Sequence, residues 1–366
     1  MVSDVFFTNM RTNKSAGMLD KLEKLCRTAK LADSISGNDL VAIKIHFGEM
    51  GNTAYIRPTY VRRVVNMIKE KGGNPFLTDA NTLYVGSRAN AVDHLRTAVE
   101  NGFAYAVVNT PLIIADGLNG KDYVKVPIKG GKHFKEVNIG STAVHADTII
   151  ALTHFKGHEA TGFGGTLKNI GMGLGSRSGK QQMHSDILPK VKEEKCIACG
   201  RCVSWCPTHA ITIVKNAVIN QEKCIGCGEC TVTCNERAID INWRTEPNII
   251  QEKIVEYALG VLQDKQGKSF FINFVTNVTP DCDCVSWSDA PIVSDIGILA
   301  SRDPIALDQA SLDLVNKAKA LPETRIDNGD KDPDKFKAIH GIDGSIQLSY
   351  GEELGLGSRQ YNLIEL

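Results

Sequence analysis

Short apolar runs alternate with longer amphipathic segments along most of this chain. The apolar runs are rich in β-branched and aromatic residues, which is typical of buried strands. They cover residues 40–45, 74–78, 148–152 and 269–275. The segments Pro58–Lys71 and Ala89–Asn101 instead repeat an apolar residue every three or four positions and run into glycine, which predicts helices. The alternation predicts an α/β fold with a mixed or mostly parallel sheet.

The same patterns predict the remaining elements. They are strands at residues 105–108 and 292–299, a hairpin of residues 123–128 and 134–139, and helices at 247–262 and 304–318. Asp303 and Pro304 suit the N-cap and the first position of that last helix. Beyond Leu321 the chain is polar and rich in turn residues. Cys26 lies among leucines at helical spacing, so we expect it in the core.

Eight of the eleven cysteines form two matched runs. Each run has the spacing Cys-x-x-Cys-x-x-Cys-x-x-x-Cys, the pattern of a bacterial ferredoxin with two [4Fe-4S] clusters, in which the fourth cysteine of a run binds the other cluster. The first cluster is therefore assigned to Cys196, Cys199, Cys202 and Cys234, and the second to Cys224, Cys227, Cys230 and Cys206. Zinc, which needs only four ligands, and disulfides, which are disfavoured without a secretory signal, are the weaker alternatives.

The two runs belong to an internal repeat. Residues 195–215 and 223–243 are identical at ten of twenty-one aligned positions, which predicts a module with pseudo-twofold symmetry. We expect an α+β ferredoxin-like domain at residues 191–243, inserted into an α/β domain made of residues 1–190 and 244–366. These two parts are called the cysteine module and the α/β body.

Charge and composition exclude several classes of partner. The chain has 42 basic and 42 acidic residues, so its net charge gives no support to nucleic-acid binding. No apolar run approaches the roughly eighteen residues of a spanning helix, and residues 1–7 lack the basic start of a signal peptide. We therefore expect a reducing cytoplasm, no membrane, and a redox partner protein or a small electron donor.

Reactive side chains follow four of the predicted strands. They are His46 and Glu49, Asp79 and Asn81, His154, Lys156 and His158, and Asp281 to Cys284. Ligands of open α/β sheets bind at the carboxyl ends of the strands, so we expect these residues to converge if the strands are parallel. His154, His158 and Lys168 are the candidate catalytic residues for a small-molecule substrate.

A glycine-rich segment follows the third of these strands. Gly164 and Gly165 could form an anion-binding nest for a cofactor, to which Lys168 would add a positive charge. His184 could fold back toward this segment as a metal ligand. The alternative is a glycine-rich connection with solvated lysines.

Cys282 and Cys284 lie outside the two cysteine runs. In a loop, both could reach one additional metal ion. Their acidic neighbours would raise the pKa of a free thiol, which argues against simple thiolate nucleophiles. The alternative is a pair of buried or idle cysteines.

Longer motifs give the chain a family resemblance. They are Lys44–Glu49, His154–His158, Gly164–Gly173, Asp281–Cys284 and Asp295–Pro304. Together they resemble the domain of unknown function 362 family, whose members often carry a two-cluster ferredoxin insertion. The resemblance spans most of the chain and implies iron–sulfur binding, without implying a particular reaction.

A second resemblance is to nickel-pincer lactate racemases. His158, the run Gly162-Phe163-Gly164-Gly165, Lys168 and His184 follow the order and roughly the spacing of a histidine, a glycine-rich run with a lysine, and another histidine in that family. The resemblance implies an acid/base at His158, a cofactor tether at Lys168 and a metal ligand at His184. The other catalytic histidine of that family has no clear match in this chain.

These features favour an iron–sulfur oxidoreductase. Electrons would pass from two [4Fe-4S] clusters to a substrate or metal site in the α/β body. One alternative is an electron carrier or scaffold without a catalytic site of its own. Another is a redox-gated isomerase of the nickel-pincer racemase type.

Overall fold

A central sheet of eight strands organises the α/β body in this computed structural model, which describes residues 2–84, 86–184, 189–224, 228–240, 245–326 and 333–366. In spatial order the strands are β16 (Tyr361–Glu365), β1 (Ser3–Asn9), β15 (Gly297–Ser301), β14 (Ser269–Val275), β7 (Thr148–His154), β2 (Leu40–Ile45), β3 (Asn74–Asp79) and β4 (Leu112–Ile114). Strands that are distant in sequence, such as β7 and β14, are neighbours in this order.

The sheet is mostly parallel, as the alternation of strands and helices predicts. The neighbours β14, β7, β2, β3 and β4 pair in parallel, and β1 pairs in parallel with β16. Strand β15 is antiparallel to both β14 and β1. The carboxyl ends of β2, β3, β7 and β14 therefore meet at one edge of the sheet, where the reactive side chains were expected to converge.

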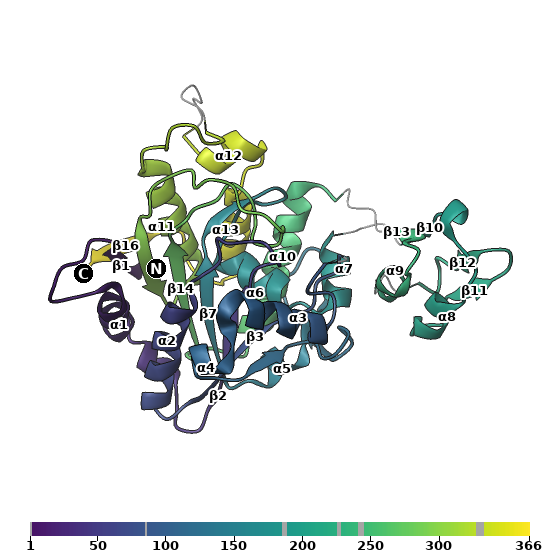
Figure 1. Cartoon of the computed structure of the whole chain (residues 1–366), viewed down its shortest axis with the longest axis horizontal. Coiled ribbons are helices and arrows are strands. Elements are labelled where there is room, and N and C mark those ends of the chain that lie inside the picture. The colour runs from purple at the N-terminus through teal and green to yellow at the C-terminus, as the bar shows by residue number, and fades with distance from the viewer. Residues whose placement is uncertain (1, 85, 185–188, 225–227, 241–244, 327–332) are drawn as a thin grey trace.

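Helices cover both faces of the sheet and bury two separate apolar cores (Figure 1). One face carries α1 (Met18–Thr28), α2 (Pro58–Glu70), α3 (Ala91–Ala98) and α4 (Tyr105–Val108), and the other carries α6 (Thr166–Leu174), α10 (Pro247–Leu262), α11 (Pro304–Lys317) and α13 (Ser345–Glu353). Cys26 of α1 is fully buried, as predicted. Asp303 caps α11 by accepting hydrogen bonds from the backbone N–H groups of Ile305 and Ala306 at 2.8 and 2.9 Å, a contact that typically contributes about 1 kcal/mol.

Smaller elements fill the connections. They are α5 (Ser141–His145), α7 (Arg177–His184), α12 (Lys335–His340), the predicted hairpin of β5 (Tyr123–Pro127) and β6 (Glu136–Gly140), and a second hairpin of β8 (Lys156–His158) and β9 (Gly162–Gly164). The helix expected to reach Asn101 ends in a π-helical turn, Val99–Phe103, in which Gly102 has a φ of 90°. Few L residues other than glycine adopt this conformation.

Three predictions of secondary structure were wrong. Residues 105–108 form helix α4 rather than a strand, and only Val108 of the four is buried, so the apolar run does not form part of the sheet. Strand β15 starts at Gly297 instead of residue 292, because Ile292 and Val293 pair with residues 278, 320 and 321 rather than with the central sheet. The tail beyond Leu321 contains α12, α13 and β16, which the polar composition obscured.

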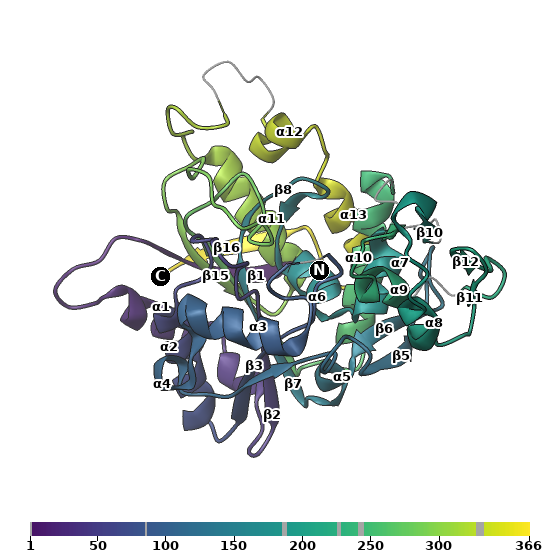
Figure 2. The ribbon, with the colours of Figure 1, turned by 45° about the vertical axis from the view of Figure 1, so that its right-hand side comes forward.

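The cysteine module forms its own small structure beside α7 and α10 (Figures 1 and 2). Its elements are β10 (Lys190–Val191) paired with β13 (Ile239–Asp240), β11 (Ile211–Ile213) paired with β12 (Ala217–Ile219), and the helices α8 (Arg201–Trp205) and α9 (Glu229–Thr233). Cysteines and a few aliphatic residues make up its core. The boundaries at residues 191 and 243 stay predictions, and residues 226, 227 and 243 lie outside the described ranges.

Candidate functional site

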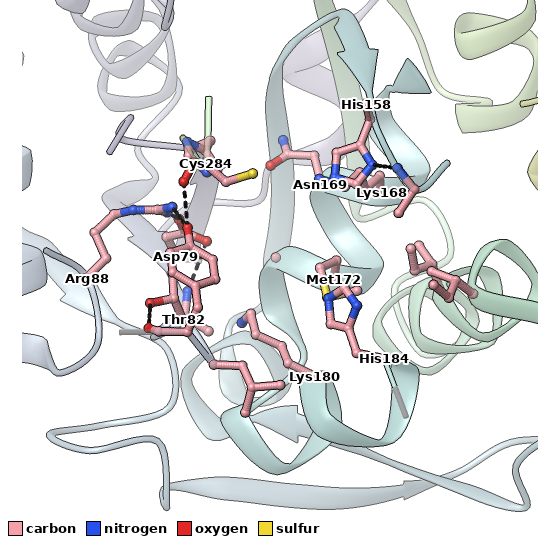
Figure 3. A pocket seen from close by; sticks show the side chains of 18 of the residues that line it. Asp79, Thr82, Arg88, His158, Lys168, Asn169, Met172, Lys180, His184 and Cys284 are labelled. Carbon is pink, nitrogen blue, oxygen red and sulfur yellow. Dashed lines mark hydrogen bonds and ion pairs between the residues drawn. The ribbon is translucent and has the colours of Figure 1, made fainter. Parts of the chain in front are cut away.

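A cavity of about 320 Å³ lies at the carboxyl edge of the sheet (Figure 3). Strands β2, β3, β7 and β14, or the segments after them, each contribute to its wall. Its reactive lining residues are Lys44, His46, Asp79, Arg88, Lys156, His158, Lys168, Lys180, His184 and Cys284. His46, Asp79, Lys156, His158 and Cys284 thus converge on one cavity, as predicted, because the parallel strands end at one edge. Glu49, Asn81, His154 and Asp281 do not line it.

Cys282, Cys284 and His158 form a compact group beside this cavity, which Cys284 and His158 line. The ligand atoms of the three side chains all lie within 4.8 Å of one another. Gly157 explains how two distant segments meet: a Cβ atom there would lie 1.9 Å from the carbonyl oxygen of Pro280. Because glycine has no Cβ, its N–H can approach and donate to the Thr279 carbonyl at 2.9 Å. This close approach carries His158 against the loop that contains the two cysteines.

The electrostatics of the two thiols differ sharply. A hydrogen bond from Cys284 holds the pKa of Cys282 well below its ordinary value, and the charge of Lys168 and a hydrogen bond from His158 add to this effect against the cost of burial. The same contact holds the pKa of Cys284 well above its usual range. Lys168 Nζ lies 3.4 Å from Cys282 Sγ. The pair is therefore a thiolate, Cys282, that accepts from a neutral thiol, Cys284.

The expectation that acidic neighbours raise the thiol pKa was wrong for Cys282. The Asp283 side chain is fully buried and turns away from both sulfurs. Its carboxylate lies 2.9 Å from His154 Nδ1 and 3.7 Å from Lys156 Nζ. The charge of His154 lowers the pKa of Asp283 to about 2, against the cost of burial, which is the largest effect. Although Asp283 lies between Cys282 and Cys284 in the sequence, its carboxylate therefore pairs with His154 and Lys156 rather than with the two thiols.

The two candidate catalytic histidines occupy different positions. His154 contacts the loop that contains Cys282 and Cys284, and its Nε2 lies 3.0 Å from the Thr276 carbonyl. It does not line the cavity. His158 does line the cavity. The backbone N–H of Ala160 donates to His158 Nδ1 at 3.1 Å, so a neutral ring carries its hydrogen on Nε2. His154 therefore positions the loop, whereas His158 can donate a proton inside the cavity.

Gly164 and Gly165 do not line the cavity. Gly165 precedes helix α6, and the Asp308 carboxylate accepts from the N–H groups of Thr166 and Leu167 at 2.7 and 3.0 Å. A Cβ at Gly165 would lie 2.5 Å from Asp308 Cγ. A carboxylate of the chain itself thus fills the place where a nest for an external anion was expected. Lys168, one turn further along, does face the cavity.

Helix α7 brings further residues into the site. His184 lines the cavity, so it does fold back toward the glycine-rich segment as the sequence suggested. Burial lowers the pKa of His184 to about 3, and the charges of His158 and Lys168 act in the same direction. His184 is therefore neutral at physiological pH.

Sequence reasoning missed Lys44, Arg88 and Lys180, which all line the cavity. A signal existed for Lys44, since a lysine inside the buried run LVAIKI is unexpected unless it has a partner. That partner is Asp79, at 3.1 Å. For Arg88 and Lys180 the sequence offers no comparable signal, because both lie in mixed polar segments.

Four cysteines of the module surround one small cavity. They are Cys196, Cys199, Cys202 and Cys234, the set assigned to the first cluster. Backbone N–H groups approach the sulfurs: Ala217 N lies 3.4 Å from Cys196 Sγ, and Ala238 N lies 3.2 Å from Cys234 Sγ. In the part of the chain that is described, every cysteine is free of disulfide bonds. Cys227 of the second set lies outside that part.

The cysteine module contacts the α/β body through its second cysteine loop. A Cβ at Gly228, whose φ is 71°, would lie 3.0 Å from Gln181 Oε1 and 3.2 Å from Leu83 Cδ1. Leu83 also lines the cavity of the α/β body. Nearby, Lys121 Nζ lies 3.9 Å from the ring centre of Trp205 in α8. The second cysteine loop therefore touches the wall of the candidate site.

These features define an α/β protein with a reactive cavity at the carboxyl edge of its sheet and a cysteine-rich module against the cavity wall. The model of the domain of unknown function 362 family matches residues 41–313, and the chain belongs to this family, as its motifs predicted. No curated protein matches the chain. No helix within the described ranges is both long enough and apolar enough to span a bilayer.

The structure matches parts of two solved structures. The first is the lactate racemase apoprotein from Thermoanaerobacterium thermosaccharolyticum, with 13% identity and a TM-score of 0.40, covering 75% of this chain and 51% of that one. The second is a protein from Thermotoga maritima, with 11% identity and a TM-score of 0.40, covering 78% of this chain and 56% of that one. The chain thus spans about half the length of these proteins.

Proposed function

We propose that this chain is an iron–sulfur redox protein in which the cysteine module holds two [4Fe-4S] clusters and the cavity of the α/β body is the site that uses their electrons. When bound, the clusters supply single electrons at potentials that hydrogen bonds to sulfur help to set. The residues of the chain do the rest: they bind the clusters, shape the cavity, and hold charges and protons at defined atoms.

The arrangement of the cysteines suits clusters better than single zinc ions. Around one tetrahedral zinc ion, thiolate sulfurs lie about 3.8 Å apart. Among the residues that the structure describes, the set of three ligand atoms that come within 4.8 Å of one another is His158, Cys282 and Cys284. The four cysteines around the module cavity are spread more widely, which favours a larger cofactor. The N–H groups directed at their sulfurs favour an anionic one.

The observation that carries the proposal is the close approach of Gly228 to Leu83, where a Cβ atom on Gly228 would lie 3.2 Å from Leu83 Cδ1. Gly228 lies between two cysteines assigned to the second cluster, and Leu83 lines the cavity. A module that served only as a carrier would need no such contact with a reactive cavity. The contact therefore favours electron use inside this chain over the carrier or scaffold alternative. The donor, a redox protein or a small molecule, stays a prediction, as does a cytoplasmic location.

The thiol pair is proposed to hold the metal ion that would accept these electrons, because the two thiols are themselves fully reduced. Cys282 and Cys284 are soft ligands that suit a thiophilic metal ion. His158 is the third donor of the group, but the hydrogen bond from Ala160 leaves its hydrogen on Nε2, whereas metal-bound histidines usually donate from the second nitrogen. The thiolates are therefore the primary ligands, and Lys168 and His158 stabilise their negative charge.

Iron content tests the clusters. Anaerobically reconstituted protein is expected to hold about eight irons. Cys234→Ala should lower this content to about four and remove the same electron paramagnetic resonance signal as Cys196→Ala, because the two residues serve one cluster. Cys26→Ala is the matched control and should keep all the iron. Zinc near two per chain with negligible iron would contradict the proposal.

The thiol pair has its own test. The double variant Cys282→Ser, Cys284→Ser should retain both clusters while losing additional metal or the reoxidation of the reduced clusters by substrate. Metal content and turnover equal to those of the unaltered protein would instead support the carrier alternative.

A nickel-pincer type of isomerase is the second candidate. The observation in its favour is that His158, Lys168 and His184, to which the racemase resemblance assigns roles, all line one cavity. Native mass spectrometry and nickel analysis of protein purified anaerobically test this directly. Protein that lacks both nickel and a nucleotide-derived adduct on Lys168 would exclude this candidate.

A further inference from the structure

The cavity carries more positive than negative charge. Its cationic lining residues are Lys44, Arg88, Lys156, Lys168 and Lys180. Its carboxylates are Asp79 and Glu159, and the Glu159 side chain is 53% exposed to solvent. Burying cations is costly unless each has a counter-ion, so the question is which of the five cations are compensated.

Carboxylates compensate three of these cations. Lys44 Nζ lies 3.1 Å from Asp79 Oδ1, and Arg88 Nε lies 3.0 Å from Glu49 Oε2. Lys156 Nζ lies 3.7 Å from Asp283 Oδ2. These three pairs stabilise the cavity wall and leave little charge for a ligand.

The remaining two lysines have no carboxylate within 4.0 Å in the described part of the chain. Lys168 Nζ faces Cys282 Sγ at 3.4 Å, and Lys180 Nζ donates to the Gly175 carbonyl at 2.7 Å. Lys180 is only 6% exposed. A buried ammonium group whose partner is one carbonyl retains two unused N–H donors, and the carboxylates of Asp116 and Asp79 act on its charge without a direct ion pair. Both properties are what an oxyanion needs from its binding site.

The rest of the wall is apolar. Leu83, Met172, Ile250 and Ile254 line the same cavity. Figure 3 shows Met172 and His184 between Lys168 and Lys180 in that view, so the charged and apolar parts of the wall adjoin. A volume of about 320 Å³ is at the lower end of the range for small-molecule sites, which is roughly 300–1,000 Å³.

We propose that the cavity binds a small organic acid whose oxyanion head, a carboxylate or a phosphate, is held by Lys180, and whose apolar body lies against Met172, Ile250 and Ile254. This proposal rests on the proposed function, since it names the substrate class of the same cavity. The anion supplies a direct hydrogen-bonded counter-ion for Lys180, and Cys284 lies on the opposite side of the cavity from Lys180 (Figure 3).

Calorimetric titration with benzoate, phenyl phosphate and the neutral benzyl alcohol tests the proposal on the full chain. At least one anion should bind, and benzyl alcohol should bind at least tenfold more weakly. The tighter of the two anions identifies the head group. Lys180→Met should weaken anion binding at least tenfold, because a charge-assisted hydrogen bond in a buried site is lost. Lys180→Arg, which keeps the charge, should retain most of the affinity.

Lys125→Met is the matched control, because Lys125 is a surface lysine that pairs with Glu136 outside the cavity. It should bind the anions as the unaltered protein does. Failure of both anions to bind, or equal binding by Lys180→Met, would overturn the proposal. Iron is measured on the same samples: iron without anion binding refutes this inference alone, and anion binding without iron refutes the proposed function alone.

Discussion

Lys168 Nζ lies 3.4 Å from Cys282 Sγ, although 114 positions separate the two residues. Helix α6 presents the lysine, and the loop after β14 presents the cysteine. The two elements meet because β7 and β14 are adjacent parallel strands whose carboxyl ends share one edge. This contact joins the glycine-rich segment and the cysteine pair, which the sequence shows as separate motifs, into one site.

Lys168→Met should raise the pKa of Cys282. The Cys284 hydrogen bond is the largest cause of the low pKa and would remain, so the shift should be partial. Alkylation by iodoacetamide, followed for the peptide that contains Cys282 across a pH series, measures the change. The midpoint should move to higher pH and the rate at neutral pH should fall. Lys125→Met is the control, and an identical midpoint in both variants would show that Lys168 does not stabilise the thiolate.

Gly157→Ala should disrupt the cysteine site through the backbone. A Cβ there would lie 1.9 Å from the Pro280 carbonyl oxygen, so β8 and the cysteine loop must separate. Overpacking of this kind costs about 1–3 kcal/mol of unfolding free energy, measurable by urea denaturation. The alkylation midpoint of Cys282 should rise as well, because His158 moves away. Gly37→Ala, where a Cβ meets nothing within 4 Å, should change neither quantity.

Asp308→Asn should destabilise the start of α6. The carboxylate accepts hydrogen bonds from Thr166 N, Leu167 N and Asn273 Nδ2. The asparagine side chain has an NH₂ group in place of one carboxylate oxygen, so this NH₂ group would face one of these N–H groups. A buried donor without an acceptor costs about 1–3 kcal/mol. Thermal or urea unfolding should show this loss, while Asp264→Asn at an exposed position should be neutral. Equal stability of the two variants would mean that Asp308 does not hold the helix terminus.

Lys180 should make stability depend on pH in the alkaline range. Burial lowers its pKa to about 8 in the folded chain, whereas the unfolded chain holds the proton up to about 10.4. Between these values the unfolded state binds more protons, so the free energy of unfolding rises with pH. Burying the protonated lysine lowers the free energy of unfolding by at most about 3 kcal/mol, and this full loss applies below pH 8.

Lys180→Met should remove this dependence. Urea unfolding at pH 7 and pH 10, without added anion, measures it. The variant should be more stable than the unaltered protein at pH 7, and the difference should shrink at pH 10. A constant difference between the two proteins would show that Lys180 is not buried as a charged group.

Much of the fold was predictable because its determinants are local. Period and composition identified β2, β3, β7 and β14, and the Asp303-Pro304 pair identified the start of α11. The failures have local causes too. Tyr105–Val108 has strand-like composition but lies mostly exposed, and β16 is a short, largely exposed edge strand that only its pairing with β1 defines.

The sequence by itself determined which residues are chemically reactive and how the cysteines are spaced, since both depend on residue type and short intervals along the chain. It also implied that reactive groups at four strand ends converge, provided that the strands are parallel. Only the tertiary structure decided which groups are paired. Asp283 turns to His154, Asp308 occupies the expected anion nest, and Lys180 donates to a backbone carbonyl without a direct ion pair to any carboxylate in the described ranges.

The physical reason is that electrostatic pairing acts over a few ångströms in space and is indifferent to distance along the chain. Whether a buried charge destabilises the fold or can bind a ligand depends on the groups around it. In this cavity those groups come from β2, β3, α6, α7 and the loop after β14. The contact of Gly228 with Leu83 is of the same kind, because it joins the cysteine module to the cavity through residues that no motif connects.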